Sequence, residues 1–192
     1  MTEADFPLLS LIITIPLLGA LLAGSIRNVD VAKQIAFFTA LITFVLTACA
    51  TLLFDADKSG FQLVERYDWI PLLKIEYLVG VDGISVLFLP MTGLLTIITM
   101  LASWSAISHS SRFHFSLLLA LESVSIGVFC ALDTVLFFLF WELTLPPFFF
   151  LIGLWGIGSQ RRSAAMKYTL FMLAGGVTLL LAIIVLATNH AK

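Results

Sequence analysis

Six long apolar segments constrain this chain more than any other feature of its sequence. A helix needs about 20 apolar residues to cross the hydrocarbon core of a bilayer, which is roughly 30 Å thick. Because only 11% of the residues are charged and 60% are hydrophobic, the chain cannot cover the surface of a soluble domain. The sequence therefore predicts an all-α polytopic membrane protein and excludes a disordered chain and a nucleic-acid-binding protein. The predicted spans are residues 8–26, 34–54, 83–105, 113–132, 134–157 and 164–188.

The sizeable loop of residues 55–82 lies between the second and third predicted spans. Its two halves are rich in β-branched and aromatic residues and are separated by Pro71, a pattern typical of a β-hairpin. We expect a short extracytoplasmic hairpin on the outer face of the membrane. Tyr67, Trp69 and Tyr77 are candidate anchors at the headgroup level.

The basic residues of the short loops predict the orientation of the chain. Such residues concentrate in cytoplasmic loops, and here most arginines occur in the turns after the first, third and fifth spans. We therefore expect these turns in the cytoplasm and both termini on the opposite side. The orientation depends on Arg27, Lys33, Arg112, Arg161 and Arg162.

Three charged residues fall inside predicted spans: Glu122, Glu142 and Lys167. A charge at the bilayer centre costs roughly 2.5–3.5 kcal/mol to insert, so each is a candidate functional residue. The glutamates lie eleven residues before and nine residues after Asp133, in the turn that joins the fourth and fifth spans. At 1.5 Å per residue they are about 16 and 14 Å from the same surface. Both are therefore near the midplane, although the spacing does not show whether they face one another.

A carboxyl group at this depth has its charged form destabilised unless a cation or water supports it. A proton affinity that depends on a nearby cation suits Glu122 and Glu142 to a proton relay. The alternative is a protonated glutamate that only forms a hydrogen bond between helices. Lys167 lies about 5 Å below the cytoplasmic surface, where it either anchors the helix by snorkelling or takes part in the relay.

Two prolines follow Glu142 within about one helical turn. Pro146 has no N–H for the carbonyl of Glu142, and Pro147 has none for the carbonyl of Leu143. We therefore predict a kink or an opening of the helix beside the carboxylate. Freed carbonyls in a membrane need water, side chains or another helix, which favours proton transfer at this break over a simple helix bend.

The histidines and cysteines do not indicate a metal site. His109 and His114 flank Arg112, and their spacing places them on no common helical face, so we expect solvated loop histidines. Cys49 and Cys130 lie in apolar runs without a C-x-x-C motif, so we expect them to be small apolar core residues.

At these residues the chain resembles the antiporter-like membrane subunits of respiratory complex I, and most closely chain M of bacterial NADH-quinone oxidoreductase. The motifs occur in the family's order and cover almost the whole chain. They include Trp69-Ile-Pro71, Gly80-Val-Asp-Gly-Ile-Ser85, Phe137-Phe-Leu-Phe-Trp-Glu-Leu143, Leu151-Ile-Gly-Leu-Trp-Gly156 and Ala164-Ala-Met-Lys-Tyr-Thr169. Pro146 is a departure, because it adds a second proline beside the one that is usual in the family.

The resemblance implies a partial antiporter-like fold in which Glu142 belongs to the proton channel. Glu122 and Lys167 match positions that are common in the family. Residues 1–112 would form three N-terminal helices with the hairpin of residues 55–82. Residues 113–192 would form the first three helices of a proton-channel repeat. The family has many more spans, so the repeat is incomplete in this sequence and we expect a split or truncated chain.

The resemblance also implies a subunit of a proton-pumping NADH:quinone oxidoreductase in the bacterial inner membrane. NADH, FMN, iron–sulfur clusters and quinone would be bound by partner subunits, and this chain would hold no cofactor or metal. Expected partners are other complex I membrane subunits, the lipid bilayer and a chain that carries the missing helices, but no nucleic acid. The alternatives are a subunit of a cation/proton antiporter or membrane-bound hydrogenase complex, and a scaffold that does not pump protons.

Overall fold

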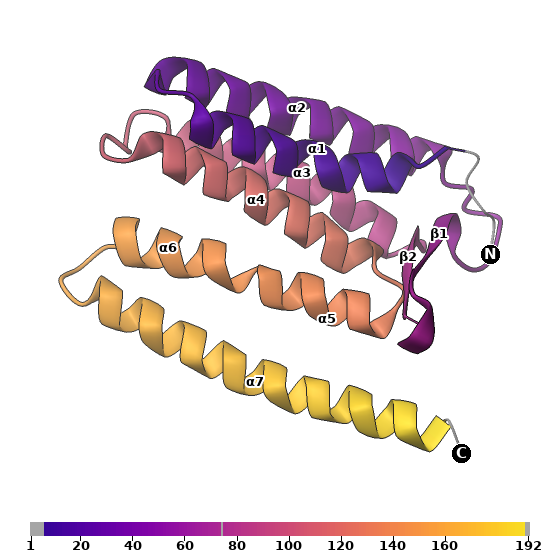
Figure 1. Cartoon of the computed structure of the whole chain (residues 1–192). Helices are drawn as coiled ribbons and strands as arrows, with labels where there is room; N and C mark the ends of the chain where they lie inside the picture. The colour runs from indigo at the N-terminus through magenta and orange to yellow at the C-terminus, as the bar shows by residue number, and fades with distance from the viewer. Residues whose placement is uncertain (1–5, 74, 191–192) are drawn as a thin grey trace.

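The computed structural model describes residues 6–73 and 75–190. The described chain is an elongated helical bundle with a hairpin at one end (Figure 1). The element order is α1 (Leu8–Ser25), α2 (Val29–Leu53), β1 (Gln62–Ile70), a 3-10 turn (Pro71–Leu73), β2 (Ile75–Val81), α3 (Ser85–Ser103), α4 (Ser111–Cys130), α5 (Thr134–Leu143), α6 (Leu145–Trp155) and α7 (Arg161–His190).

Within the described residues, six spans are long and apolar enough to cross a membrane, with α5 and α6 together forming one of them. This confirms the predicted number of spans. Helix α2 begins at Val29 rather than at residue 34, because Asn28 caps it. The Asn28 side chain accepts hydrogen bonds from the backbone N–H groups of Asp30 (3.0 Å) and Val31 (3.3 Å). The charged first turn of α2 therefore extends the helix beyond its apolar part.

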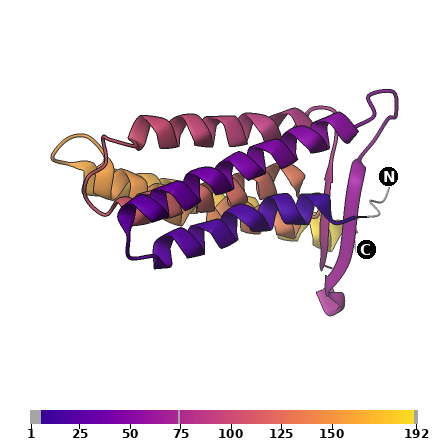
Figure 2. The same cartoon turned by 90° about the horizontal axis from the view of Figure 1, so that it is seen from above.

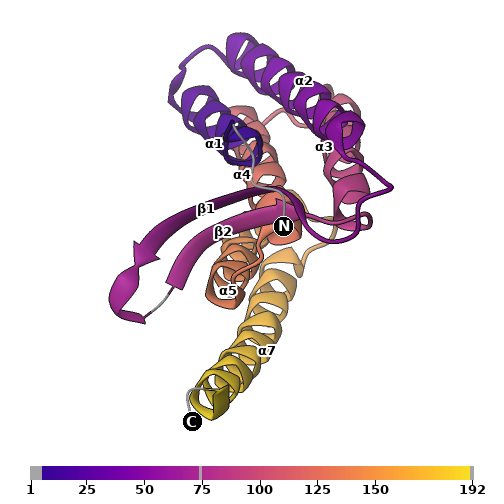
Figure 3. The ribbon, with the colours of Figure 1, turned by 90° about the vertical axis from the view of Figure 1, so that its right-hand side faces the viewer.

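Helix α4 is the centre of the packed part of the bundle. It contacts α1, α2 and α3 as well as α5 and α6, and the end-on view shows α4 between α1 and α5 (Figure 3). Two serines fix it against α1: Ser116 Oγ donates to the carbonyl of Ala20, and Ser123 Oγ to that of Ile13, both at 2.6 Å. The division of the chain into residues 1–112 and residues 113–192 stays a prediction.

Helices α5, α6 and α7 form a more open layer next to this group (Figure 1). In the most apolar stretch of each span, 61% of the residues are buried in α4 but only 6% in α7. The side chains of α5 and α7 near the middle of this layer therefore have fewer neighbours within the chain than those of α4.

The predicted hairpin is present and lies across one end of the bundle (Figure 2). Strands β1 and β2 pair antiparallel. The Glu65 carboxylate of β1 accepts hydrogen bonds from the backbone N–H groups of Leu9 (2.6 Å) and Ser10 (3.1 Å) and from Ser10 Oγ. It thereby satisfies free donors at the start of α1. On the other strand, the Leu78 carbonyl accepts from Leu132 N at 2.9 Å, which joins the hairpin to the α4–α5 turn.

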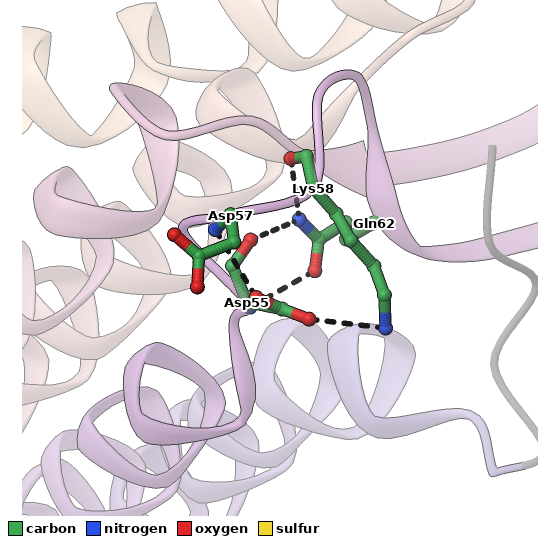
Figure 4. Close-up of polar contacts among 4 residues, drawn as sticks. All are labelled: Asp55, Asp57, Lys58 and Gln62. Atoms are coloured by element: carbon green, nitrogen blue, oxygen red, sulfur yellow. Dashed lines mark hydrogen bonds and ion pairs between the residues drawn. The ribbon is translucent and has the colours of Figure 1, made fainter.

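The loop between α2 and β1 is closed by its own polar groups (Figure 4). Gln62 Nε2 donates to the carbonyl of Asp55 at 2.7 Å, and its Oε1 accepts from Asp55 N at 3.0 Å. Lys58 Nζ lies 3.0 Å from Asp55 Oδ2, and this hydrogen-bonded ion pair lowers the pKa of Asp55. These contacts fix where β1 begins.

The basic residues of the predicted cytoplasmic turns lie at the opposite end from the hairpin, which we call the arginine end. Here Arg112 Nη1 donates to the Ile26 carbonyl at 3.0 Å and Lys33 Nζ to the Trp104 carbonyl at 2.7 Å. The connections α1–α2, α3–α4 and α6–α7 all lie at this end (Figure 1).

One histidine prediction is wrong. His109 lies exposed in the α3–α4 connection, as expected, but His114 is a buried residue of α4. Its ring packs edge-on against Trp155, with centroids 4.7 Å apart. The reason is that His114 lies in the first turn of α4, which begins at Ser111, and the face of this turn that carries His114 packs on Trp155 at the end of α6.

Candidate functional site

Glu122 lies near the middle of α4 and is almost completely buried, with only 1% of its surface exposed. Neither carboxylate oxygen has a hydrogen-bond partner among the described residues. A buried polar group without a partner is costly and requires an explanation in the structure. An acid in this position is therefore a candidate functional group rather than a packing element.

The Glu122 side chain lines a groove of about 510 Å³ between α3, α4 and α6. On α4 the groove follows one helical stripe, because Leu118, Glu122, Ser125 and Phe129 recur every three or four residues. Facing them on α3 are hydroxyl groups, each donating to a carbonyl of its own helix. These belong to Thr92 (2.7 Å), Thr96 (3.0 Å) and Thr99 (2.7 Å). Their oxygens remain able to accept a hydrogen bond.

Glu142 lies two residues before the interruption between α5 and α6, which the structure places at Thr144. Thr144 N donates to the Trp141 carbonyl at 3.2 Å, and Thr144 Oγ1 donates to the same carbonyl at 2.7 Å. Pro146 and Pro147 then occupy the first turn of α6, where a missing N–H costs little. The span is thus divided beside the carboxylate.

The Glu142 carboxylate points at the backbone of α7. Its Oε1 atom is buried and has no partner among the described residues. A Cβ added at Gly176 of α7 would overlap Oε1 and lie 2.9 Å from Cδ of Glu142. The carboxylate and the Gly176 backbone are therefore in direct contact.

The two acids consequently lie in different spaces between helices. Glu122 faces the groove formed with α3 and α6, whereas Glu142 contacts α7. The sequence placed them at similar depth and left their relative orientation open. The structure shows that similar depth does not bring them into one cluster.

Lys167 is an exposed residue in the second turn of α7, near the arginine end. Nine residues separate it from Gly176, and at 3.6 residues per turn this places the two about half a turn apart around the helix. The structure therefore does not bring Lys167 to Glu142. Its exposure is consistent with snorkelling, and its relay role stays a prediction.

Sequence reasoning missed Gly176. The available signal was the pair Gly175-Gly176 within a long apolar span, since glycine disfavours a helix interior unless packing requires it. Within residues 6–73 and 75–190, no group of three or more His, Cys, Asp or Glu side chains is placed to hold a metal ion.

Known proteins resemble this chain in sequence. A family model described as "NADH:quinone oxidoreductase/Mrp antiporter, TM" matches residues 131–191. NAD(P)H-quinone oxidoreductase chain 4 3 of Picosynechococcus sp. is 38% identical over 188 residues, which are 96% of this chain and 34% of that protein. F(420)H(2) dehydrogenase subunit M of Methanosarcina mazei is 35% identical over 177 residues, which are 92% of this chain and 36% of that one. The chain thus spans about a third of the length of these relatives.

Two solved structures share the fold. The archaeal membrane-bound sulfane sulfur reductase superimposes with a TM-score of 0.77 at 23% identity, over 96% of this chain and 28% of that chain. The Mrp complex from Dietzia sp. gives a TM-score of 0.77 at 21% identity, over 96% of this chain and 19% of that one. The helical arrangement with its hairpin is therefore common to several membrane complexes.

Proposed function

We propose that this chain contributes part of a proton-translocation half-channel to an NADH:quinone oxidoreductase. The chain is homologous to the N-terminal third of chain 4 proteins, which are complex I/Mrp antiporter-like membrane subunits of the chain 4/M type. The observation that carries the proposal is Glu142, placed directly beside an interrupted helix, with a buried Oε1 atom that has no hydrogen-bond partner in the part of the chain that the structure describes. The chain is a multi-pass membrane protein in which this interruption lies well inside a span.

The chemistry of the proposal is the binding and release of a proton by the Glu142 carboxylate. The prolines free the Glu142 and Leu143 carbonyls from helical hydrogen bonds, which supports access of water to this depth. Glu122 would act as a second acid, because its groove offers threonine oxygens that could hold water. Lys167 would supply a positive charge near the arginine end, where protons would enter or leave.

The rest of the machine would be supplied by other parts of the complex. NADH, FMN, iron–sulfur clusters and quinone would bind in partner subunits, and other complex I membrane subunits would flank this one. Further helices of the kind that the relatives carry would complete the channel. The arginine end would face the cytoplasm of a bacterial inner membrane, with the hairpin and both termini outside.

Cation/proton antiport is the second candidate. The matching family model includes the Mrp antiporter, and the Mrp complex shares the fold. The Methanosarcina relative is a subunit of an F(420)H(2) dehydrogenase. This relative supports a variant of the first proposal, in which the electron donor of the complex is not NADH. A pH change driven by an imposed Na⁺ gradient, without any electron donor, would favour antiport.

The test is Glu142→Gln in the intact complex in native membranes. Glutamine keeps the shape but cannot carry a proton, so we expect proton pumping to fall at least about tenfold. Pumping is measured as donor-dependent quenching of a pH-sensitive dye in inverted vesicles, with assembly checked by native electrophoresis. Asp57→Asn, a change at an exposed loop acid, is the control. Normal pumping by an assembled Glu142→Gln complex would contradict the proposal.

A further inference from the structure

We infer that Gly176 is the positioning residue for Glu142: the absence of a side chain at Gly176 creates the space between α5 and α7 in which the carboxylate lies. The inference rests on the proposed role of Glu142 as a proton carrier. It adds the residue that decides where this carrier is held.

The contact surface of α7 supports this role. Among the described side chains of α7, only Ala165 and Gly176 are buried. They lie eleven residues apart, about three turns, and therefore on the same face of the helix. Small residues at such positions allow close approach of helices in a membrane. These two small residues are thus the points at which α7 is most completely covered by its neighbours within the chain.

The two contacts differ in what they meet. Ala165 packs opposite Gly153 of α6, where an added Cβ on Gly153 would lie 3.5 Å from the Ala165 Cβ, an ordinary van der Waals distance. At Gly176, an added Cβ would overlap Glu142 Oε1 and lie 2.9 Å from Cδ and 3.5 Å from Oε2. The first contact is apolar packing, whereas the three atoms nearest to the added Cβ in the second all belong to the Glu142 carboxylate.

A single added methyl group would therefore displace the acid. Rotation of Glu142 away from α7 would move its carboxylate by about an ångström or more, and a misplacement of about 1 Å can slow a positioned reaction by up to about a hundredfold. Because α7 has few other contacts at this level, the shift would occur without loss of a packed core.

Gly175 provides a matched control. Among the described residues, no atom outside the helix itself lies within 4 Å of a Cβ added at Gly175. Alanine has a higher helix propensity than glycine, so Gly175→Ala and Gly176→Ala favour the α7 helix equally. A difference between the two variants then reports the contact with Glu142.

The experiment uses the intact complex in native membranes, with two measurements for each variant. The first is proton pumping per electron transferred. The second is the rate at which dicyclohexylcarbodiimide modifies Glu142, followed by mass spectrometry over a range of pH. We expect Gly176→Ala to lower pumping by roughly tenfold and to change the modification rate at least twofold, because the carboxylate leaves its enclosed position. Gly175→Ala should match the parent in both.

A second variant separates positioning from general packing. Glu142→Asp shortens the side chain by one methylene and withdraws the carboxylate from α7, so Gly176→Ala should have little further effect in that background. Two results would overturn the inference. One is that Gly176→Ala impairs assembly to the same extent in the parent and in the Glu142→Asp background. The other is that Gly176→Ala leaves the modification rate of Glu142 unchanged.

Carbodiimide modification does not require pumping. Normal pumping by Glu142→Gln with altered modification in Gly176→Ala would therefore reject the proposed function and retain the positioning.

Discussion

Glu122 is buried and Glu142 is half-buried, and the helices that carry these two acids are held in different ways. Glu122 is part of α4, whose neighbours enclose it on several sides and whose serines are hydrogen-bonded to α1. Glu142 is the second-last residue of the short helix α5, beside a break, and its carboxylate contacts the backbone of the sparsely packed α7. The difference indicates that the surroundings of Glu122 are fixed by packing, whereas those of Glu142 depend on a helix with few contacts within the chain.

The largest expected effect comes from closing the break. Pro146→Ala together with Pro147→Ala restores two backbone N–H groups, so that the Glu142 and Leu143 carbonyls regain helical partners. The helix should become continuous and Glu142 as fixed as Glu122. We expect proton pumping to fall by roughly tenfold, measured in inverted vesicles. Pro16→Ala, which makes the same chemical change inside α1, is the control, and unchanged pumping by the double variant would show that the break is not needed.

The second prediction concerns the cost of Glu122. An unpartnered buried polar group costs about 1–3 kcal/mol, so Glu122→Leu should raise the free energy of unfolding by an amount in this range while it lowers pumping. Thermal unfolding of the detergent-solubilised complex measures the first effect. A lower stability of Glu122→Leu would instead show that the carboxyl group holds the helices together, and Glu122→Gln separates charge from shape.

The third prediction tests how firmly α4 is fixed. Ser123→Ala removes the hydrogen bond to the Ile13 carbonyl and should cost about 0.5–1.5 kcal/mol of stability. Thr178→Ala removes a similar hydroxyl from the exposed surface of α7, where Oγ1 donates to the carbonyl of Ala174 at 3.0 Å, and should cost less. Equal losses in thermal unfolding would argue against the difference in packing between the two regions.

The smallest expected effect is a dependence of the fold's stability on pH, caused by Asp82 at the start of α3. Helix α3 forms one wall of the Glu122 groove. Asp82 Oδ1 accepts hydrogen bonds from the backbone N–H groups of Ser85 (2.7 Å) and Ile84 (3.1 Å). The first of these contributes most to a pKa of Asp82 below the ordinary value of 3.8. The ionised form therefore stabilises the fold above pH 3.8, and this contribution is lost as the pH falls through the lowered pKa.

Loss of a negative charge at a helix N-terminus lowers the free energy of unfolding by about 0.5 kcal/mol. The stability of Asp82→Asn should thus fall less than that of the parent between pH 4 and pH 2, as measured by thermal unfolding. Parallel pH profiles of the two proteins would contradict the role of this carboxylate. The effect is confined to the wall of the groove, so Glu142 should not respond to it.

The spans and the hairpin could be predicted because each depends on local sequence. An apolar run of about 20 residues determines a crossing, and β-rich stretches around Pro71 determine a hairpin. The rotation of each helix about its axis depends instead on contacts between distant residues. For this reason the sequence did not show that Glu122 faces α3 while Glu142 faces α7, or that His114 is buried against Trp155.

The boundaries of helices α2 and α4 illustrate the same limit. Charged residues in the first turns, such as Lys33 and Arg112, suggested loops, yet both helices continue beyond the apolar core toward the arginine end. There Lys33 and Arg112 donate to carbonyls at Trp104 and Ile26, beside connections to neighbouring helices. A helix in a membrane protein is therefore longer than its apolar stretch when tertiary partners exist for its polar end.

The contact between Glu65 and the start of α1 has a consequence for biogenesis. The acceptor for Leu9 N lies 56 residues later in the chain, so the first span is synthesised and inserted before its partner has left the ribosome. Until Glu65 arrives, the amides at the start of α1 depend on water as their hydrogen-bond partner. Since Leu78 also accepts from Leu132 N, the hairpin joins the first helix to the turn after the fourth. The start of α1 and the end of α4 therefore receive these hydrogen bonds only after segments far apart in the chain have been synthesised.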